Sequence, residues 1–207
     1  LAPLNWRLTT DELRYATTDS TPRLLLHAAE FGETAAALGA PATIDIDGPD
    51  YAALVHTPLQ GWAPPQVGPD DPVCLMYTSG TTGKPKGALI PHRQVVWNAI
   101  GTAASWGLTA EDVAPVLTPM FHAGGLFVFL PPLVFVGGRS VLSPGFETKS
   151  TLDLLAQERI TCMLAVPAML QMLLDAPELA RTDLGALRFL ISGGAPCSPA
   201  LVEAWHA

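Results

Sequence analysis

The stretch Y-T-S-G-T-T-G-K-P-K-G at residues 77–87 begins within the end of a strand-like run at 73–79 and precedes a second short apolar run at 88–90. It holds four small hydroxyl side chains and three glycines within ten positions, together with two lysines. Backbone N–H groups and hydroxyls in such a loop can surround phosphate oxygens, and glycine permits the close approach that this requires. The stretch therefore predicts a phosphate-binding loop between two strands.

The main alternative for this loop is a polar hairpin that binds nothing, which is what most turns rich in Gly, Ser and Thr are. The lysines favour phosphate, because Lys84 and Lys86 are two of only three lysines in the chain. The loop is not a Walker A motif, since too few residues separate Gly80 from Gly83 and Pro85 stands where that motif has Ser or Thr. It is not a G-x-G-x-x-G motif either.

The composition sets limits on the class of protein. The chain has 207 residues, of which 49% are apolar and 14% are charged, so it has enough apolar surface for a core and does not fit intrinsic disorder. Its formal net charge of −8 argues against a nucleic-acid partner. The longest uncharged run, residues 113–138, is broken by prolines and glycine pairs, which argues against a membrane-spanning helix.

The cysteines and histidines give no sign of a disulfide, a metal site or a thiol nucleophile. The three cysteines lack paired spacing, and Cys74 and Cys162 lie in apolar runs, so we expect buried free thiols and a cytoplasmic protein. Cys197 has no visible base beside it. No pair among the five histidines has metal-ligand spacing, and His92 is interpreted as a helix cap.

Short apolar runs alternate with helical patterns along the chain. Continuous rather than alternating apolar strands predict a mostly parallel α/β sheet covered by helices on both faces. Strands are expected at 23–28, 73–79, 113–118, 139–143, 161–166 and 187–192. Helices are expected at 93–105, 126–130, 150–158, 167–174 and from Ser198, which caps a helix with Pro199 at its first position. Residues 57–72, rich in Pro and Gly, predict an exposed connection.

Three of these expectations concern particular side chains. The helix at 93–105 should bury a face made of Val96, Ile100 and Ala103. The helix at 150–158 should open with a capping box of Ser150 and Asp153. The apolar residues 126–130 predict a buried helix.

Residues 77–87 resemble the phosphate loop of the adenylate-forming superfamily, which includes acyl-CoA synthetases, adenylation domains of peptide synthetases and luciferases. Two more stretches resemble the superfamily in matching order. T-P-M-F-H-A-G-G at 118–125 is similar to the "P-x-F-H" segment at the acyl pocket, and S-G-G-A-P at 192–196 is similar to the turn against the adenine. The opening L-N-W-R-L at 4–8, with Glu12 and Leu13, resembles the acyl-CoA synthetase branch.

The resemblance implies a role for each matching residue. His122 would lie between the carboxylate and the tunnel for the incoming thiol. The adenine would be stacked on or edged by Gly193, Gly194, Ala195 and Pro196. The phosphates would be held by Thr78, Ser79, Gly80, Thr81, Thr82, Gly83, Lys84 and Lys86. ATP with Mg²⁺, a carboxylic acid and coenzyme A are the implied cofactors and partners, and no metal-ligating residue is assigned in this chain.

The resemblance also implies that the chain is part of the large N-terminal domain of an adenylate-forming enzyme. Residues 1–56 would form preceding β/α units and 73–207 the phosphate-loop, acyl-pocket and adenine-turn region. The family's magnesium-holding Glu, its ribose-binding Asp and its C-terminal lid would follow residue 207, so we expect the isolated chain to be inactive.

The expected activity of the parent is that of a medium- or long-chain fatty acyl-CoA synthetase. An adenylating enzyme that loads a carrier protein or uses an aryl acid stays open, as does a non-catalytic nucleotide-binding or scaffold module. Whether the protein forms a homodimer is also left open.

Overall fold

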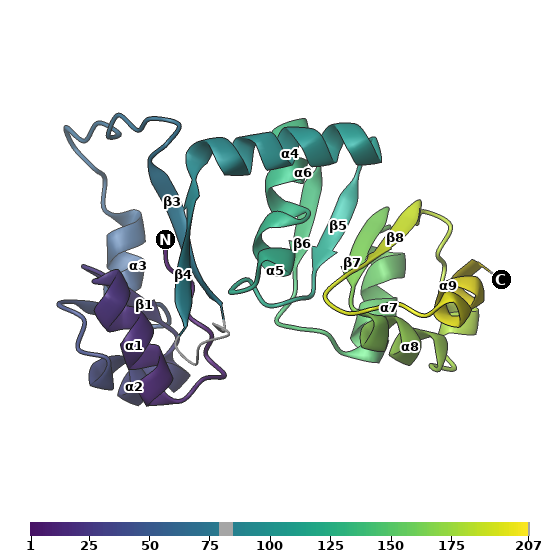
Figure 1. Cartoon of the computed structure of the whole chain (residues 1–207), viewed down its shortest axis with the longest axis horizontal. Helices are drawn as coiled ribbons and strands as arrows, with labels where there is room; N and C mark the ends of the chain where they lie inside the picture. The colour runs from purple at the N-terminus through teal and green to yellow at the C-terminus, as the bar shows by residue number, and fades with distance from the viewer. Residues whose placement is uncertain (79–84, 207) are drawn as a thin grey trace. The chain divides into compact units, whose positions relative to one another are not determined.

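A computed structural model of the chain describes residues 1–78 and 85–206 (Figure 1). The chain divides into two compact units, Leu1–His92 and Arg93–Ala207. Ser79, Gly80, Thr81, Thr82, Gly83 and Lys84 of the predicted phosphate loop lie outside the described residues.

The first unit begins with a helix, α1 (Thr10–Ser20), that is capped at its amino end. The Thr9 side chain accepts from the Glu12 backbone N–H, and the Glu12 carboxylate accepts from the Thr9 N–H at 2.8 Å. Two short parallel strands follow, β1 (Leu25–His27) and β2 (Thr43–Asp45). Between and after them lie η1 (Ala29–Phe31), α2 (Gly32–Ala37) and α3 (Pro49–His56). Residues 57–72 are exposed throughout.

The first unit ends in an antiparallel hairpin of β3 (Pro72–Thr78) and β4 (Lys86–Pro91). Gly87 lies where the strands crowd, since a Cβ there would come within 2.7 Å of Cδ1 of Leu75. Cys74 and Met76 of β3 are buried. The two apolar runs on either side of the predicted phosphate loop are therefore the paired strands of a hairpin.

The second unit alternates strands and helices. α4 (His92–Trp106) follows β4 directly and leads into β5 (Val113–Val116). The remaining elements are α5 (Ala123–Phe127), α6 (Leu130–Val136), β6 (Arg139–Leu142), α7 (Thr148–Gln157), β7 (Cys162–Ala165), α8 (Pro167–Leu174), η2 (Leu179–Arg181), β8 (Phe189–Ser192) and α9 (Pro199–His206). Pro199 opens α9, and the Ser198 hydroxyl accepts from the Leu201 N–H at 3.2 Å, which confirms that cap.

The strands of the second unit form two parallel pairs, and β5 of one pair lies beside β7 of the other. β5 pairs with β6 and β7 pairs with β8, both in parallel register. The Thr161 N–H, just before β7, donates to the Val113 carbonyl at the start of β5 at 2.9 Å. Figure 1 shows these strands with helices on either side.

Side chains of these strands alternate between two apolar cores. Ala114, Cys162, Leu164, Phe189 and Ile191 pack with Ala103 of α4 and Phe129 and Leu133 next to and within α6. Val113, Met163, Ala165 and Leu190 pack with Leu152 and Leu155 of α7, Leu170 and Leu173 of α8 and Leu201 of α9. Helices therefore cover both faces, which confirms the predicted α/β architecture.

Three local predictions were wrong. The N-cap of α7 is Glu147, whose carboxylate accepts from the Lys149 and Ser150 N–H groups, while Asp153 instead pairs with Lys149 at 2.8 Å. On α4 the prediction was wrong for Val96, which is 51% exposed, whereas Ala103 is buried and Ile100 half-buried as expected, with Ala99 buried beside them.

The apolar stretch 126–130 is not one helix. α5 ends at Phe127 and α6 begins at Leu130, with Pro131 in its first turn, where a missing N–H is tolerated. Phe129, between the helices, is buried against Trp106 with ring centroids 5.5 Å apart.

The expected free thiols are present: Cys74 and Cys162 are buried and unpaired, and Cys197 is half-buried. Within residues 1–78 and 85–206, no helix is long and apolar enough to cross a membrane.

Candidate functional site

The ends of the phosphate-loop hairpin hold two predicted phosphate ligands, Thr78 and Lys86, opposite each other. They are paired in the β3–β4 register, and the Thr78 hydroxyl donates to the Lys86 carbonyl at 3.4 Å. Both residues are exposed. The hairpin thus brings an aliphatic hydroxyl and an ammonium group to the same end of the two strands, next to the loop.

Tyr77 of β3 joins the hairpin to α1 by a hydrogen bond that the sequence analysis did not predict. The Tyr77 hydroxyl donates to the Asp19 carboxylate at 2.6 Å. Burial, together with this carboxylate, raises the pKa of Tyr77 to about 12. The phenol therefore stays protonated and keeps donating across the neutral range.

The segment 118–125 follows the carboxyl end of β5 and turns tightly into α5. His122 is the N-cap residue of α5; its N–H donates to the Pro119 carbonyl at 3.0 Å, and its side chain is exposed and makes no cap hydrogen bond. A Cβ at Gly125 would lie 2.4 Å from the carbonyl oxygens of Thr118 and Pro119. Only glycine fits there, so the turn that presents His122 depends on the second glycine of the motif.

The predicted adenine turn, residues 193–196, follows the carboxyl end of β8. Gly194 has φ of +81°, a left-handed conformation that favours glycine. Gly194, Ala195 and Pro196 are exposed, and Gly193 is half-buried. A backbone turn with exposed small residues leaves room for a planar ligand to approach.

Leu164 of β7 lies between the 118–125 segment and the adenine turn. A Cβ at Gly124 would lie 3.3 Å from its Cδ2, and a Cβ at Gly193 would lie 3.7 Å from its Cδ1. Both glycines therefore pack on one leucine side chain. The structure brings together His122's segment and residues 193–196 at the carboxyl ends of β5, β7 and β8, where open parallel sheets bind ligands.

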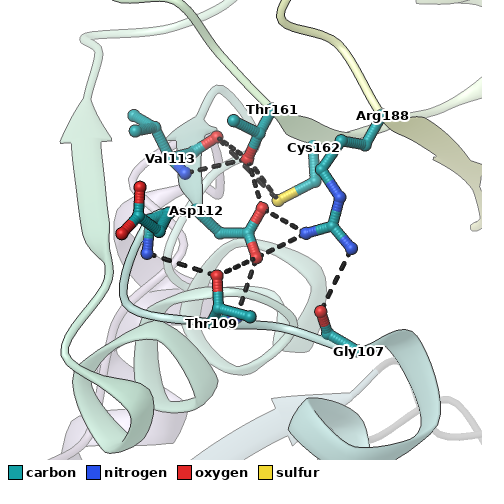
Figure 2. A network of polar contacts seen from close by, with 8 residues as sticks. Gly107, Thr109, Asp112, Val113, Thr161, Cys162 and Arg188 are labelled. Atoms are coloured by element: carbon teal, nitrogen blue, oxygen red, sulfur yellow. Dashed lines mark hydrogen bonds and ion pairs between the residues drawn. The ribbon is translucent and has the colours of Figure 1, made fainter.

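At the opposite, amino ends of these strands lies a polar network that the sequence analysis missed (Figure 2). The Asp112 side chain is 1% exposed and accepts from Nη1 of Arg188 at 2.6 Å to each carboxylate oxygen. It also accepts from the Thr161 hydroxyl at 2.6 Å and the Thr109 N–H at 2.8 Å. Asp112, Thr161 and Arg188 each stand immediately before an apolar strand, which is the one signal that could have suggested they meet.

Burial and hydrogen bonding act in opposite directions on Asp112. Burial raises the pKa of its carboxyl, but hydrogen bonds from Arg188, Thr161 and Thr109 outweigh burial and hold the pKa below its ordinary value. The hydrogen bond with Asp112 raises the pKa of Arg188. Burial also raises the pKa of the neighbouring Cys162 thiol to about 11, so this cysteine is chemically inert at neutral pH.

Metal-ligand clusters and cavities are the other features that could form a ligand site. Among residues 1–78 and 85–206, no group of three or more His, Cys, Asp or Glu side chains could hold a metal ion. An apolar cavity of about 490 Å³ lies in the first unit, lined by residues from 1–46, and no predicted site residue lines it.

Comparison with known proteins identifies relatives of the entire chain. The AMP-binding enzyme family matches residues 1–207. A feruloyl-CoA synthase from Amycolatopsis sp is 37% identical over 94% of this chain and 39% of its own length. A fatty acid–[acyl-carrier-protein] ligase from Streptomyces coeruleorubidus is 39% identical over 98% of this chain and 40% of its own length.

The solved structures agree with these relatives. MatB from Rhodopseudomonas palustris, solved with ATP bound, superposes with a TM-score of 0.86 at 32% identity and covers 99% of this chain and 41% of that chain. The chain thus spans about two fifths of the length of the proteins it matches.

Proposed function

Because the chain belongs to the AMP-binding enzyme family, we propose that it forms part of an ATP-dependent acid–thiol ligase that converts a carboxylic acid to its coenzyme A thioester. The observation that carries this proposal is the arrangement around Leu164. Two segments meet there at the carboxyl ends of parallel strands, although they lie far apart in sequence. One is residues 118–125, which contain His122, and the other is the 193–196 turn. A nucleotide and an acid bound at this edge would lie next to each other.

The proposed reaction has two halves. A carboxylate oxygen attacks the α-phosphorus of ATP, and the bond to the bridging oxygen breaks, which gives acyl-AMP and pyrophosphate. The sulfur of coenzyme A then attacks the acyl carbon and AMP leaves with the bonding electrons, while the thiol proton goes to solvent. Fixed N–H dipoles and cations that stabilise charge on the phosphates are the protein's main contribution to such a transfer.

Each described site residue has a part in this proposal. Thr78 ends β3 and Lys86 begins β4, and both would bind phosphate oxygens. Residues 79–84, which join them in sequence, would bind phosphate as well. The 193–196 turn would bind the adenine face. His122, exposed at the start of α5, would lie between the acid and the thiol. Magnesium would arrive with the ATP, and we assign it no ligand among residues 1–78 and 85–206.

We propose an acid with an apolar body, a medium- or long-chain fatty acid in the first instance. The relatives differ in this respect, since one is named for feruloyl-CoA and another for a fatty acid. The stretch around Phe129 does not favour either acid, because its side chains pack into the core with Trp106 and Leu133. An aryl acid is therefore the competing substrate class.

A carrier protein is the competing acceptor, because the Streptomyces coeruleorubidus relative is a ligase for acyl carrier protein. Buried, unpaired Cys74 and Cys162 fit a reducing, cytoplasmic setting for either acceptor.

The test is acid-dependent ATP–pyrophosphate exchange by the full-length protein that contains this sequence. The panel includes octanoate, palmitate, ferulate, malonate and an amino acid, each followed by thioester formation with coenzyme A or acyl carrier protein. Exchange with a fatty acid or an aryl acid supports the proposal and decides the substrate class. A folded protein that shows no exchange with any acid would refute it and favour a nucleotide-binding module.

A matched pair of glycine variants tests the adenine turn. A Cβ at Gly193 meets only Leu164 at the ordinary distance of 3.7 Å, so the chain tolerates a small side chain there, and Gly145 is surrounded by open space. We expect Gly193→Val to raise the KM for ATP by about tenfold or more, because a branched side chain would occupy the ligand's place. Gly145→Val should leave it unchanged. Equal KM values in both variants would contradict the placement of adenine on this turn.

The 207-residue chain alone should show no exchange. It spans about two fifths of its relatives' length, and the loss of even one preorganised donor reduces a rate by about 10²–10³-fold. Exchange by the purified chain above that of a Lys86→Ala control would show that the expectation is wrong.

A further inference from the structure

The two segments of the candidate site are carried by strands that are not neighbours. Residues 118–125 follow β5 and residues 193–196 follow β8, and β7 lies between these strands. A parallel ladder joins β8 to β7, whereas β5 meets β7 through the hydrogen bond from the Thr161 N–H to the Val113 carbonyl, so β5 and β8 are positioned against each other only through β7. The alignment of the two site segments therefore depends on how β5 and β8 are each held against β7.

These positions depend on short strands. β5, β7 and β8 have four residues each, so the backbone hydrogen bonds that hold them in place are few. A slip of one residue would turn every side chain of a strand to the other face. It would remove Leu164 from between Gly124 and Gly193, where it now packs against both segments.

The Asp112–Arg188 pair joins β5 to β8 directly, across the strand between them. Asp112 precedes β5 by one residue and Arg188 precedes β8 by one residue, and Nη1 of Arg188 lies 2.6 Å from both Asp112 oxygens. The carboxylate also accepts from the hydroxyl of Thr161, the residue before β7. One buried carboxylate thus fixes the starting points of all three strands (Figure 2).

Arg188 holds a further segment at the same point. Its Nη2 donates to the carbonyl of Gly107, the residue that follows α4, at 3.1 Å. Gly107 has φ of +59°, so the chain turns there from the helix toward Asp112. A guanidinium has a fixed planar fork of donors, which a lysine cannot reproduce.

We propose that Asp112 and Arg188 are positioning residues that hold the 193–196 turn in line with the 118–125 segment, and so set nucleotide against acid. This inference rests on the proposed ligase function. Neither side chain touches a ligand, since both act from the amino ends of strands whose carboxyl ends carry the site. Their effect should appear in how well the two substrates are aligned.

The test compares Arg188→Lys, Arg188→Met and Asp112→Asn in the full-length protein by ATP–pyrophosphate exchange. The matched control is Arg139→Met, which removes a more exposed ion pair of the same unit, Arg139 with Glu158 at 2.5 Å. KM for ATP, KM for the acid and kcat are measured at a temperature where circular dichroism shows each variant fully folded. A functional role moves these constants, whereas a purely structural role moves only the melting temperature.

We expect Arg188→Met to raise the KM for ATP or lower kcat by about ten- to hundredfold, as small misplacements of reacting groups do. Arg188→Lys should lie between this variant and wild type, because it keeps the charge and loses the fork. Arg139→Met should match wild type in all three constants. If Arg188→Met does not fold, the KM and kcat values of Arg188→Lys and Asp112→Asn test the positioning role instead.

Two results would overturn the inference in different ways. An active wild type whose folded network variants keep wild-type constants and lose only thermal stability would refute the positioning role alone. A folded wild type without exchange on any acid would refute the proposed function, and the positioning role with it.

Discussion

The Asp112–Arg188 pair should respond very differently to the loss of either partner, because one side chain is buried and the other is not. The Asp112 side chain is 1% exposed and that of Arg188 is 44% exposed. Arg188→Met leaves a buried carboxylate without its counterion, which typically costs about 3–5 kcal/mol. Asp112→Asn leaves a cation that water can reach, so the cost should be nearer that of lost hydrogen bonds, about 1–3 kcal/mol.

The difference between the two variants is therefore about 2 kcal/mol in the free energy of unfolding, with Arg188→Met the less stable. That corresponds to roughly 4–8 °C in a domain of about 200 residues, and to a smaller lowering of the melting temperature in the longer full-length protein. Thermal unfolding of the full-length variants at neutral pH, followed by circular dichroism, measures it. Asp112→Asn as destabilising as Arg188→Met would refute the reasoning from burial.

Acid provides a second, independent check on the same pair. In the wild type the pKa of Asp112 is held below its ordinary value, so its contribution to stability is present above the unfolded pKa of about 3.9. That contribution is lost as the pH falls through the lower, folded pKa. Without Arg188 the carboxyl keeps its hydrogen bonds from Thr161 and Thr109 but loses the guanidinium that also lowers its pKa, so Asp112 takes up a proton at a higher pH than in the wild type.

The melting-temperature gap between wild type and Arg188→Met should therefore begin to narrow at a higher pH than that at which the wild type itself loses the Asp112 contribution. Asp112→Asn, which has no carboxyl to protonate, should show no such narrowing. A gap that is constant with pH would mean that the carboxylate in Arg188→Met finds another partner.

Three further outcomes are expected. Gly125→Ala should lower the melting temperature far more than Gly145→Ala, because its Cβ would lie 2.4 Å from two carbonyl oxygens whereas Gly145 has nothing within 4 Å. Alkylation near pH 8 followed by peptide mass spectrometry should leave Cys162 unlabelled until the protein unfolds, since its pKa is raised to about 11; native labelling would contradict its burial. Leu133→Ala should cost about 2–5 kcal/mol by urea unfolding and Val134→Ala less than about 0.5 kcal/mol, because Leu133 is 0% and Val134 72% exposed; similar costs would disprove the α6 packing.

The sequence predicted best where the signal is local. Continuous apolar runs such as 161–166 predicted parallel strands, because a strand covered on both faces has no polar side to reveal. Ser198 and Pro199 predicted the start of α9, because capping depends on residues next to each other. The roles of the phosphate-loop residues and of His122 stay predictions, carried by family resemblance.

Prediction was wrong where two local patterns compete or where partners are distant. Ser150 is the better N-cap by residue type, but the helix begins at Thr148, and the Glu147 carboxylate accepts from the Lys149 and Ser150 N–H groups instead. The helical pattern at 93–105 identified Val96 as buried, but a helix with apolar residues on several faces does not reveal which face has a partner. Asp112 and Arg188 are 76 residues apart, and only their places immediately before apolar strands could have suggested that they meet.

The alternation of side chains along β7 separates two tasks that many proteins combine in one core. Leu164 faces the core with α6 and also contacts Gly124 and Gly193, while Met163 and Ala165 face the core with α7 and α8. Changes on the Leu164 side can alter the candidate site with little disturbance of the other core, which can meanwhile accumulate stabilising substitutions. Directed evolution could exploit this separation: one library repacks the α7–α8 face for stability, and a second varies the Leu164 side to change the candidate site.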